Sequence, residues 1–167
     1  YIVYTTIITR AIVKKWYSPY KMSQTIYPDA PRVAVGAVVI DKNRVLLVLR
    51  NKEPGKGLWA IPGGSVKLGE TVQAAAEREV LEETGLKIKA GKVIYTFDAI
   101  QRDKAGQIKY HYVILDVEAK AIDPQQPLLP DDDARDARWF TLAELNQPEL
   151  PISQPTYKLL QKIMKND

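Results

Sequence analysis

Cysteine is absent from this 167-residue sequence, and histidine occurs once, as His111. The absence of cysteine excludes disulfides, thiolate metal sites and a cysteine nucleophile, and it fits a reducing compartment, so we expect a cytoplasmic protein. One histidine cannot form a histidine-rich metal centre, and its place between two tyrosines in a strand pattern favours a structural role. No run of about 18 uninterrupted apolar residues occurs, so we predict no transmembrane helix and no contact with a membrane.

An excess of charge of one sign is also missing from most of the chain. The formal net charge is +4, from 24 basic and 20 acidic residues. The first 21 positions contain no acid and four basic residues, which leaves 20 basic residues against 20 acidic ones. Nucleic-acid-binding domains usually carry a basic face on their folded body, so we predict no nucleic-acid partner. The four basic residues are Arg10, Lys14, Lys15 and Lys21.

The composition is that of one ordinary globular domain, with 46% hydrophobic and 26% charged residues. Residues 1–31 form an N-terminal extension, in which YIVYTTIITRAIV predicts a strand and the proline-containing segment after it predicts a linker. Residues 32–167 form the body. A strand-like arm can add to the sheet edge of a second copy, so we also predict a homodimer.

Strand and helix patterns interleave in the body, which predicts an α/β or α+β fold with a mixed sheet. Apolar runs at 32–41 and 44–50 flank the dipeptide KN, which suits a tight hairpin turn. Residues 71–84 have helical composition and end at Gly85, which suits a C-cap. The remaining predictions are a short strand in GLWAIPGG, strands at 92–102, 108–120 and 137–140, a capping box at Thr141 and Glu144, and a C-terminal helix in 153–166.

Three glutamates gather on the predicted helix. At about 100° per residue, Glu79, Glu82 and Glu83 occupy one sector, which predicts that they point toward the protein body. The same sector contains the apolar residues Val72, Ala75 and Ala76. Inward carboxylates need a counter-charge, and Mg²⁺ or Mn²⁺ prefers oxygen ligands of this kind. The alternative is a salt-bridged helix face that uses Arg78 and nearby lysines.

The glycine-rich segment PGGSVKLG precedes this helix and can bring metal and phosphate together. Gly64 is followed after five residues by Glu70, and after seven more by REVLEETGL, residues 78–86. This pattern resembles a complete Nudix box, with every defining position at the defining spacing. A looser resemblance covers about residues 32–145, through LWAIPGG, KYHYVILD and ARWFTLAEL, and leaves out the N-terminal extension.

The resemblance implies a Nudix-type α/β/α sandwich with a mixed β-sheet, in which the box is a loop–helix–loop catalytic motif. It implies hydrolysis of a nucleoside diphosphate linked to another moiety, with Mg²⁺ or Mn²⁺ as cofactor and a small nucleotide as partner. Carried over by position, Glu79, Glu82 and Glu83 would be metal ligands, and the carbonyl of Gly63 would be a further ligand. Arg78 would orient the glutamates through charge-assisted hydrogen bonds.

Two further roles in catalysis stay open at this point. Glu70 would pair with the box arginine, reach the metal through water, or only fix the loop. The base that takes a proton from the attacking water would be a box glutamate, here Glu82 or Glu83, or an acid on a distant loop. Asp133 is the preferred loop acid, and a solvated acidic loop is the alternative. The other loop candidates are Asp131, Asp132 and Asp136.

Four residues are candidates for contact with the substrate. Arg50 and Lys52 flank the strand that enters GLWAIPGG, where they could meet the substrate's phosphates or remain on the surface. Arg102, near the end of a long strand, is a weaker phosphate candidate. Trp59 could stack on a base, or it could pack in the core.

The substrate is less well defined by the sequence. LWAIPGG and KYHYVILD resemble the ADP-ribose pyrophosphatase-like branch of the family, which implies ADP-ribose as substrate and AMP and ribose 5-phosphate as products. One alternative is a nucleoside triphosphate pyrophosphohydrolase, including one that removes oxidised nucleotides. A second is a non-catalytic nucleotide-sensing domain, although residues 146–167 are too few for a winged helix and the box is intact.

Overall fold

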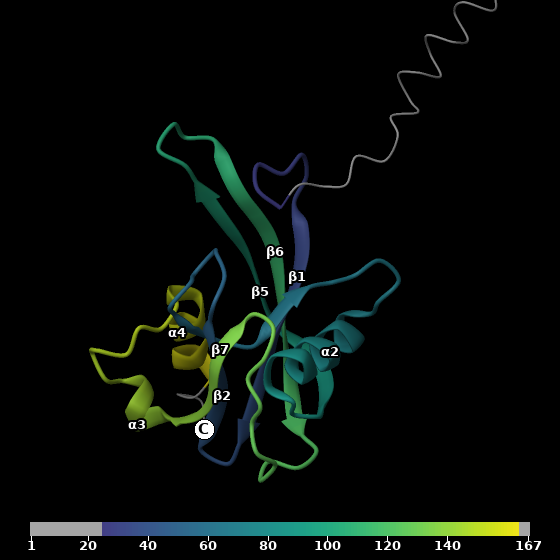
Figure 1. Ribbon diagram of the computed structural model, residues 1–167, viewed down its shortest axis with the longest axis vertical. Coiled ribbons are helices and arrows are strands. Elements are labelled where there is room, and N and C mark those ends of the chain that lie inside the picture. The colour runs from purple at the N-terminus through teal and green to yellow at the C-terminus, as the bar shows by residue number, and fades with distance from the viewer. Residues whose placement is uncertain (1–24, 164–167) are drawn as a thin grey trace, which may run out of the picture.

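The computed structural model describes residues 25–163 (Figure 1). The strand predicted in YIVYTTIITRAIV, on which the homodimer prediction rests, lies outside these residues. The described segment before the first strand contacts the body: the Tyr27 backbone N–H donates to the Lys109 carbonyl at 2.9 Å, and its hydroxyl donates to Asp103 at 3.0 Å. The first strand begins at Arg32.

A seven-stranded mixed sheet forms the centre of the described chain. Its main path has the order β3-β2-β1-β6-β5, with β4 paired to β1 and β7 paired to β2. The β1–β6 pair is parallel and the other pairs are antiparallel, which confirms the predicted mixed sheet. The strands are β1 (Arg32–Asp41), β2 (Arg44–Arg50), β3 (Trp59–Ala60), β4 (Gly63–Ser65), β5 (Ile88–Arg102), β6 (Ile108–Ala121) and β7 (Ala134–Thr141). The helices are α2 (Val72–Thr84), α3 (Leu142–Leu145) and α4 (Gln154–Ile163), and none of them is long and apolar enough to cross a membrane.

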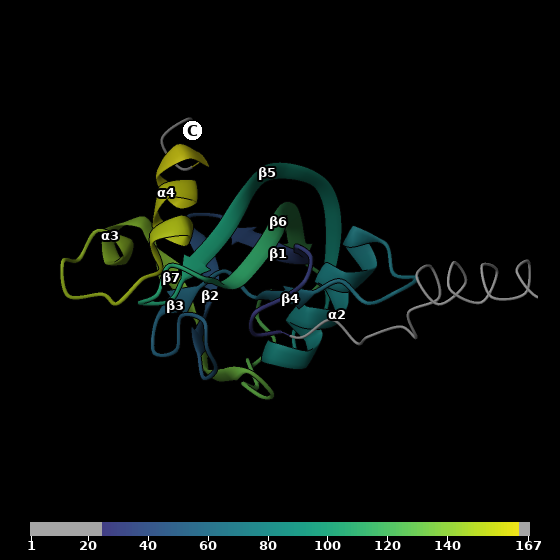
Figure 2. The same cartoon turned by 90° about the horizontal axis from the view of Figure 1, so that it is seen from above.

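Two apolar cores lie on opposite faces of the sheet, because successive side chains of a strand point to opposite sides. On β1, Val35 and Ala37 belong to the core that α2 covers, whereas Val38 belongs to the core that includes Leu159 and Leu160 of α4. Figure 2 shows α2 and α4 on opposite sides of the strands. This arrangement confirms the predicted α/β/α layers.

Several local predictions are confirmed. The turn between β1 and β2 falls at the predicted KN dipeptide. Helix α2 is capped at its start by the Thr71 hydroxyl and at its end by Gly85, which has φ 70°. The capping box of α3 joins Thr141 and Glu144 in both directions. These elements depend on neighbours in the sequence, which is why the sequence alone predicts them.

Three strands differ from their predicted ranges. GLWAIPGG contains two short strands, β3 and β4, because Pro62 cannot donate to a ladder and separates them. Strand β5 begins at Ile88 instead of 92, and two register shifts on either side of Val93 interrupt the apolar alternation that marks a strand. Strand β7 begins at Ala134 instead of 137, because its pairing with β2 continues to that residue.

Candidate active site

The buried carboxyl group of Glu83, near the end of helix α2, contacts the glycine-rich loop of the Nudix box, residues 62–70, which is called the box loop below. Glu83 is 2% exposed, and its Oε2 accepts a hydrogen bond from the backbone N–H of Gly63 at 2.9 Å. Burial raises the pKa of this carboxyl to about 8, and the Gly63 N–H opposes that shift. The charges of Glu79 and Asp133 raise the pKa of Glu83 further, whereas Arg50 lowers it, so these side chains lie within electrostatic reach.

Glu79 fills the space beside Gly64. A Cβ at position 64 would lie 2.5 Å from the carboxyl carbon of Glu79, which is far closer than real contacts allow. The Glu79 side chain is 12% exposed, and this burial raises its pKa while Arg78 opposes the rise. Gly64 is therefore needed for the room it leaves to a carboxylate, rather than for a sharp turn.

Arg78 connects the acidic side chains of the box. Its Nε and Nη2 donate to the two oxygens of Glu70 at 2.6 and 2.8 Å, which is a bidentate pair. Its Nη1 donates to Glu79 at 2.7 Å and to Glu82 at 2.9 Å, and Nη2 also reaches the Ser65 carbonyl at 3.1 Å. These contacts suit the orienting role that the resemblance implies, and they are also the ion pairs of the alternative salt-bridged helix.

Glu70 both pairs with the arginine and fixes the loop. Its Oε2 accepts from the backbone N–H of Lys67 at 2.9 Å, which closes the turn before the helix. The hydrogen bonds from Arg78 and Lys67 lower the pKa of Glu70 to about 2, so the carboxylate stays charged across the range in which most enzymes work. Its hydrogen bonds are thus those of a structural residue of the loop.

Glu82 does not point inward as predicted. Its side chain is 39% exposed and lies 3.7 Å from the ammonium of Lys67 as well as beside Arg78. The long arginine side chain draws Glu82 and Glu79 to its own side, so the three glutamates do not share one buried sector. Within residues 25–163, no three acidic or histidine side chains are gathered closely enough to form a ready metal cluster.

The β2–β7 ladder brings the distant acidic loop to the box. The backbone N–H of Asn51 donates to the Asp133 carbonyl at 2.8 Å, close to a register shift at the end of β2. Lys52 forms an ion pair with the Asp133 carboxylate and lies 3.6 Å from that of Asp132. Asp133 and Lys52 therefore lie near Glu83, at a backbone irregularity of the kind that often re-aims side chains beside active sites.

Arg50 also lies near the box, since its charge acts on the Glu83 carboxyl. Its Nε donates to the carbonyl of Pro54 at 2.9 Å, which holds the guanidinium in the loop between β2 and β3. Of the four candidate substrate contacts, the structure thus brings Arg50 and Lys52 to one place with the glutamates.

Trp59 and Arg102 lie elsewhere. Trp59 is 8% exposed and its ring packs edge-to-face on Phe140, with centroids 4.7 Å apart. Of the two alternatives for Trp59, the structure favours packing in the core over stacking on a base, because little of the ring is exposed. Arg102 donates to the Gly106 carbonyl at 3.0 Å in the β5–β6 turn, which Figure 1 shows projecting away from α2. This placement does not support a phosphate contact.

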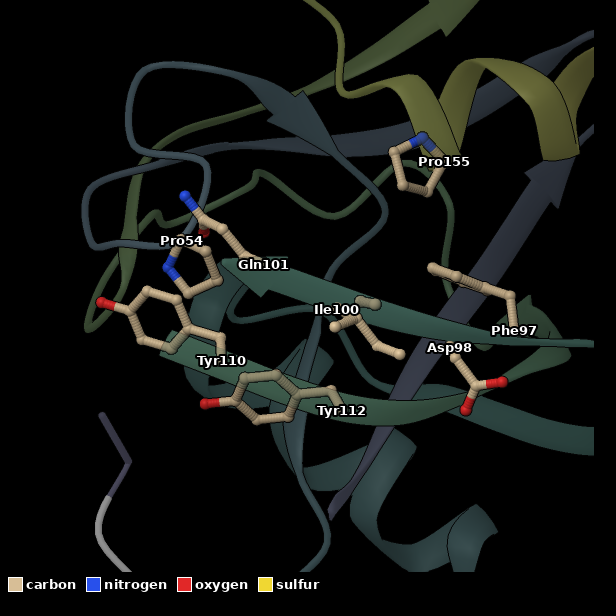
Figure 3. Close-up of a pocket in the computed structure, with 9 residues that line it drawn as sticks. Pro54, Phe97, Asp98, Ile100, Gln101, Tyr110, Tyr112 and Pro155 are labelled. Atoms are coloured by element: carbon tan, nitrogen blue, oxygen red, sulfur yellow. The ribbon is translucent and has the colours of Figure 1, made fainter. Parts of the chain in front are cut away.

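Two features of this region were not predicted. A pocket of about 320 Å³ lies between the β5–β6 hairpin, the loop after β2 and the start of α4 (Figure 3). Asp116, on β6, is buried at 4% exposure. A carboxylate within the apolar run YVILDV is an unusual strand residue, and this signal could have identified it. Nothing local in the sequence could have indicated the pocket, because its lining comes from three separate segments.

The NUDIX domain family matches residues 30–163, and the chain therefore belongs to the Nudix hydrolases. It is 39% identical over 118 residues to an ADP-ribose pyrophosphatase of Methanocaldococcus jannaschii, a match that covers 69% of this chain and 64% of that protein. It is 31% identical over 121 residues to an oxidized purine nucleoside triphosphate hydrolase of Danio rerio, covering 70% of this chain and 67% of that protein.

A similar solved structure confirms the fold. The crystal structure of a MutT NUDIX hydrolase from Burkholderia pseudomallei matches with a TM-score of 0.67 and 28% identity, over 81% of this chain and 99% of that one. The expected family, its α/β/α fold and its enzyme class are thereby confirmed. The matched region spans less than two thirds of the Methanocaldococcus jannaschii protein.

Proposed function

We propose that this Nudix hydrolase cleaves ADP-ribose to AMP and ribose 5-phosphate in a reaction that depends on a divalent cation. The observation that carries the catalytic part is the buried Glu83 carboxyl, held by Gly63 and placed within electrostatic reach of Asp133. The choice of ADP-ribose is supported by the 39% identity to an ADP-ribose pyrophosphatase.

The residues of the box fit a hard divalent cation. Their donors are carboxylate and carbonyl oxygens, and Gly64 leaves the space into which the Glu79 carboxylate fits. The ion would be held by the Gly63 carbonyl and by the carboxylates of Glu79, Glu82 and Glu83. Glu79 and Glu82 would then give up their hydrogen bonds from Arg78 and bind the ion instead. When bound, Mg²⁺ or Mn²⁺ would neutralise the diphosphate and make the attacking water more acidic.

The side chains around the box account for the remaining steps. The water oxygen attacks one phosphorus, the bridging P–O bond breaks, and the proton of the water passes to a carboxylate. Glu83 and Asp133 are candidate bases, since the charge of Asp133 acts on the buried Glu83 carboxyl. Lys52 and Arg50 would meet phosphate oxygens, and a phosphate would replace Asp133 and Asp132 as the partner of the Lys52 ammonium.

The substrate is tested by product analysis. The protein is incubated with Mg²⁺ and ADP-ribose, in parallel with nucleoside triphosphates and dinucleotides, and the products are separated by chromatography. We expect AMP to form fastest from ADP-ribose. Pyrophosphate released mainly from triphosphates would instead support the second candidate, which the resemblance to the Danio rerio enzyme favours. Binding of nucleotides without any turnover would contradict catalysis and support the alternative of a non-catalytic nucleotide-sensing domain.

The affinity for Mg²⁺ should rise with pH up to about pH 8. Because the folded protein raises the pKa of Glu83 to about 8, this carboxyl keeps its proton at lower pH, and a cation must displace it. The expected gain approaches tenfold per pH unit below that value for one displaced proton. Calorimetric titrations in two buffers of different ionisation enthalpy would count the released protons. Equal affinity at about pH 6 and pH 8 would contradict the assignment of Glu83 as a ligand.

A further inference from the structure

Asp116 is a buried acid without a partner in the described part of the chain. It is 4% exposed, and burial alone raises its pKa, to about 6, without any hydrogen bond or opposite charge that acts on it. Near neutral pH the group is therefore largely charged. An unpaired buried carboxylate is costly, and most buried polar groups have hydrogen-bond partners. This isolation suggests that its partner is a ligand.

The register of β6 shows which way Asp116 faces. Strand β6 pairs with β1 without a shift from Tyr112 to Ala119, so Tyr112 and Asp116 lie on the same face of the sheet. Val117 points to the other face, into the core under α2. Asp116 therefore belongs to the face that carries the 320 Å³ pocket, which Tyr112 and Phe97 line (Figure 3).

Asp116 does not itself line that pocket; it pairs with Tyr95 on β5, two residues before the lining residue Phe97. Phe97 on β5 pairs with Ile114, which is two residues from Asp116 on the same strand, a separation of about 7 Å. Three aromatic rings, from Phe97, Tyr110 and Tyr112, continue from this point along the sheet. Such rings suit a flat heterocycle, so the pocket has the chemistry to accept a nucleobase.

On its other side, Asp116 is close to the box loop. Its Oδ1 lies over Gly36, where a Cβ would overlap with it, and Gly36 in turn pairs with Gly63 of β4. Gly63, Gly36 and Asp116 thus lie on three adjacent strands, β4, β1 and β6. The order along the protein is the box loop, then Asp116, then the aromatic pocket.

We propose that Asp116 determines specificity by accepting hydrogen bonds from the vicinal hydroxyls of the ribose that carries the base, with the base in the Phe97–Tyr112 pocket. In a nucleotide the ribose lies between phosphate and base, as Asp116 lies between the box loop and the pocket. A carboxylate can accept both hydroxyls, as acidic residues do in dinucleotide-binding folds. The inference rests on the proposed function, since it assumes a nucleotide whose phosphates lie at the box.

The test compares AMP with 2′,3′-dideoxy-AMP as inhibitors of the 167-residue protein, with Asp116→Asn beside the wild type. Loss of hydrogen bonds to a charged group predicts that the wild type binds AMP about 10- to 100-fold more tightly than the dideoxy compound. Asp116→Asn should reduce this preference to about two- or threefold. Glu118→Gln is the matched control, because Glu118 lies on the same strand and face but is exposed, and it should keep the wild-type preference.

Three results would overturn the proposal. One is equal inhibition of the wild type by AMP and 2′,3′-dideoxy-AMP, which needs no variant and so does not depend on whether Asp116→Asn folds. Another is an unchanged preference in a folded Asp116→Asn. The third concerns IMP, which lacks the 6-amino group of AMP. If IMP binds more weakly than AMP to the wild type but equally well to Asp116→Asn, the carboxylate contacts the base and not the ribose.

The proposed substrate can fail separately. If triphosphates are hydrolysed and ADP-ribose is not, the choice of ADP-ribose is wrong, while the same comparison of ATP with 2′,3′-dideoxy-ATP still decides the role of Asp116. If no nucleotide binds, both proposals are wrong together.

Discussion

Replacing Glu83 with glutamine should lower kcat/KM for the nucleotide substrate by about a thousandfold, the scale of a lost catalytic acid or base. Glu83 is buried at the junction of α2 and the box loop, and glutamine cannot provide the negative charge that a cation needs or a base that accepts a proton. Steady-state kinetics with saturating Mg²⁺ measures the effect.

The same substitution should leave the metal-free fold nearly unchanged near pH 7. The pKa of Glu83 is raised to about 8, so the carboxyl is already neutral at that pH, as an amide is. The amide oxygen can still accept the N–H of Gly63. A loss of activity with an unchanged melting temperature would therefore assign the effect to chemistry rather than to folding.

Glu77→Gln is the matched control for this substitution. Glu77 lies on the same helix, where it accepts from the Ala90 backbone N–H at 3.1 Å and lies 3.3 Å from the ammonium of Lys89. An amide oxygen can keep the backbone contact, so activity should change by less than about threefold, as for most surface substitutions. A Glu83→Gln enzyme that keeps more than a tenth of wild-type activity would contradict the proposed mechanism.

Replacing Arg78 with alanine should destabilise the protein and reduce its activity together. Arg78 donates to three carboxylates and to the Ser65 carbonyl, and its loss would leave Glu70 and Glu79 without their main partner. Charge-assisted hydrogen bonds of this kind contribute about 2 kcal/mol or more to the free energy of unfolding. Urea denaturation of the metal-free protein measures that loss.

The pH dependence of this loss follows from Glu70. Arg78 lowers the pKa of Glu70 below its ordinary value, to about 2, so the pair stabilises the folded state above the ordinary carboxyl pKa of about 4.5. That contribution is lost as the pH falls toward about 2. The difference between wild type and Arg78→Ala should therefore shrink in acid. A difference that stays constant down to about pH 3 would show that packing, not the ion pair, carries the effect.

Arg78→Lys separates charge from geometry. Lysine keeps the positive charge but cannot donate in parallel to both oxygens of Glu70. We expect intermediate stability and activity closer to the alanine variant, because the fixed positions of Glu79 and Glu82 depend on the fork of the guanidinium. Full activity in Arg78→Lys would show that only the charge matters.

The helix of the site was predictable because its signals are local. Thr71 caps its start and Gly85 its end, and the spacing of the glutamates between them marks the box. The direction of each glutamate was not predictable in the same way. Helical periodicity places Glu82 beside Glu83, but Arg78 holds Glu82 at the exposed rim.

The sequence by itself determined the family, the box and its helix, since these depend on residue types at short, fixed spacings. Only the tertiary structure decided which distant groups join the box. Asp133 reaches Glu83 because β2 and β7 pair along their length, and Trp59 is buried because Phe140 packs against it. Asp116 lies on the same face of the sheet as the aromatic pocket through the registers of β1, β5 and β6. Pairing between strands far apart in the chain depends on the whole core, and no local pattern encodes it.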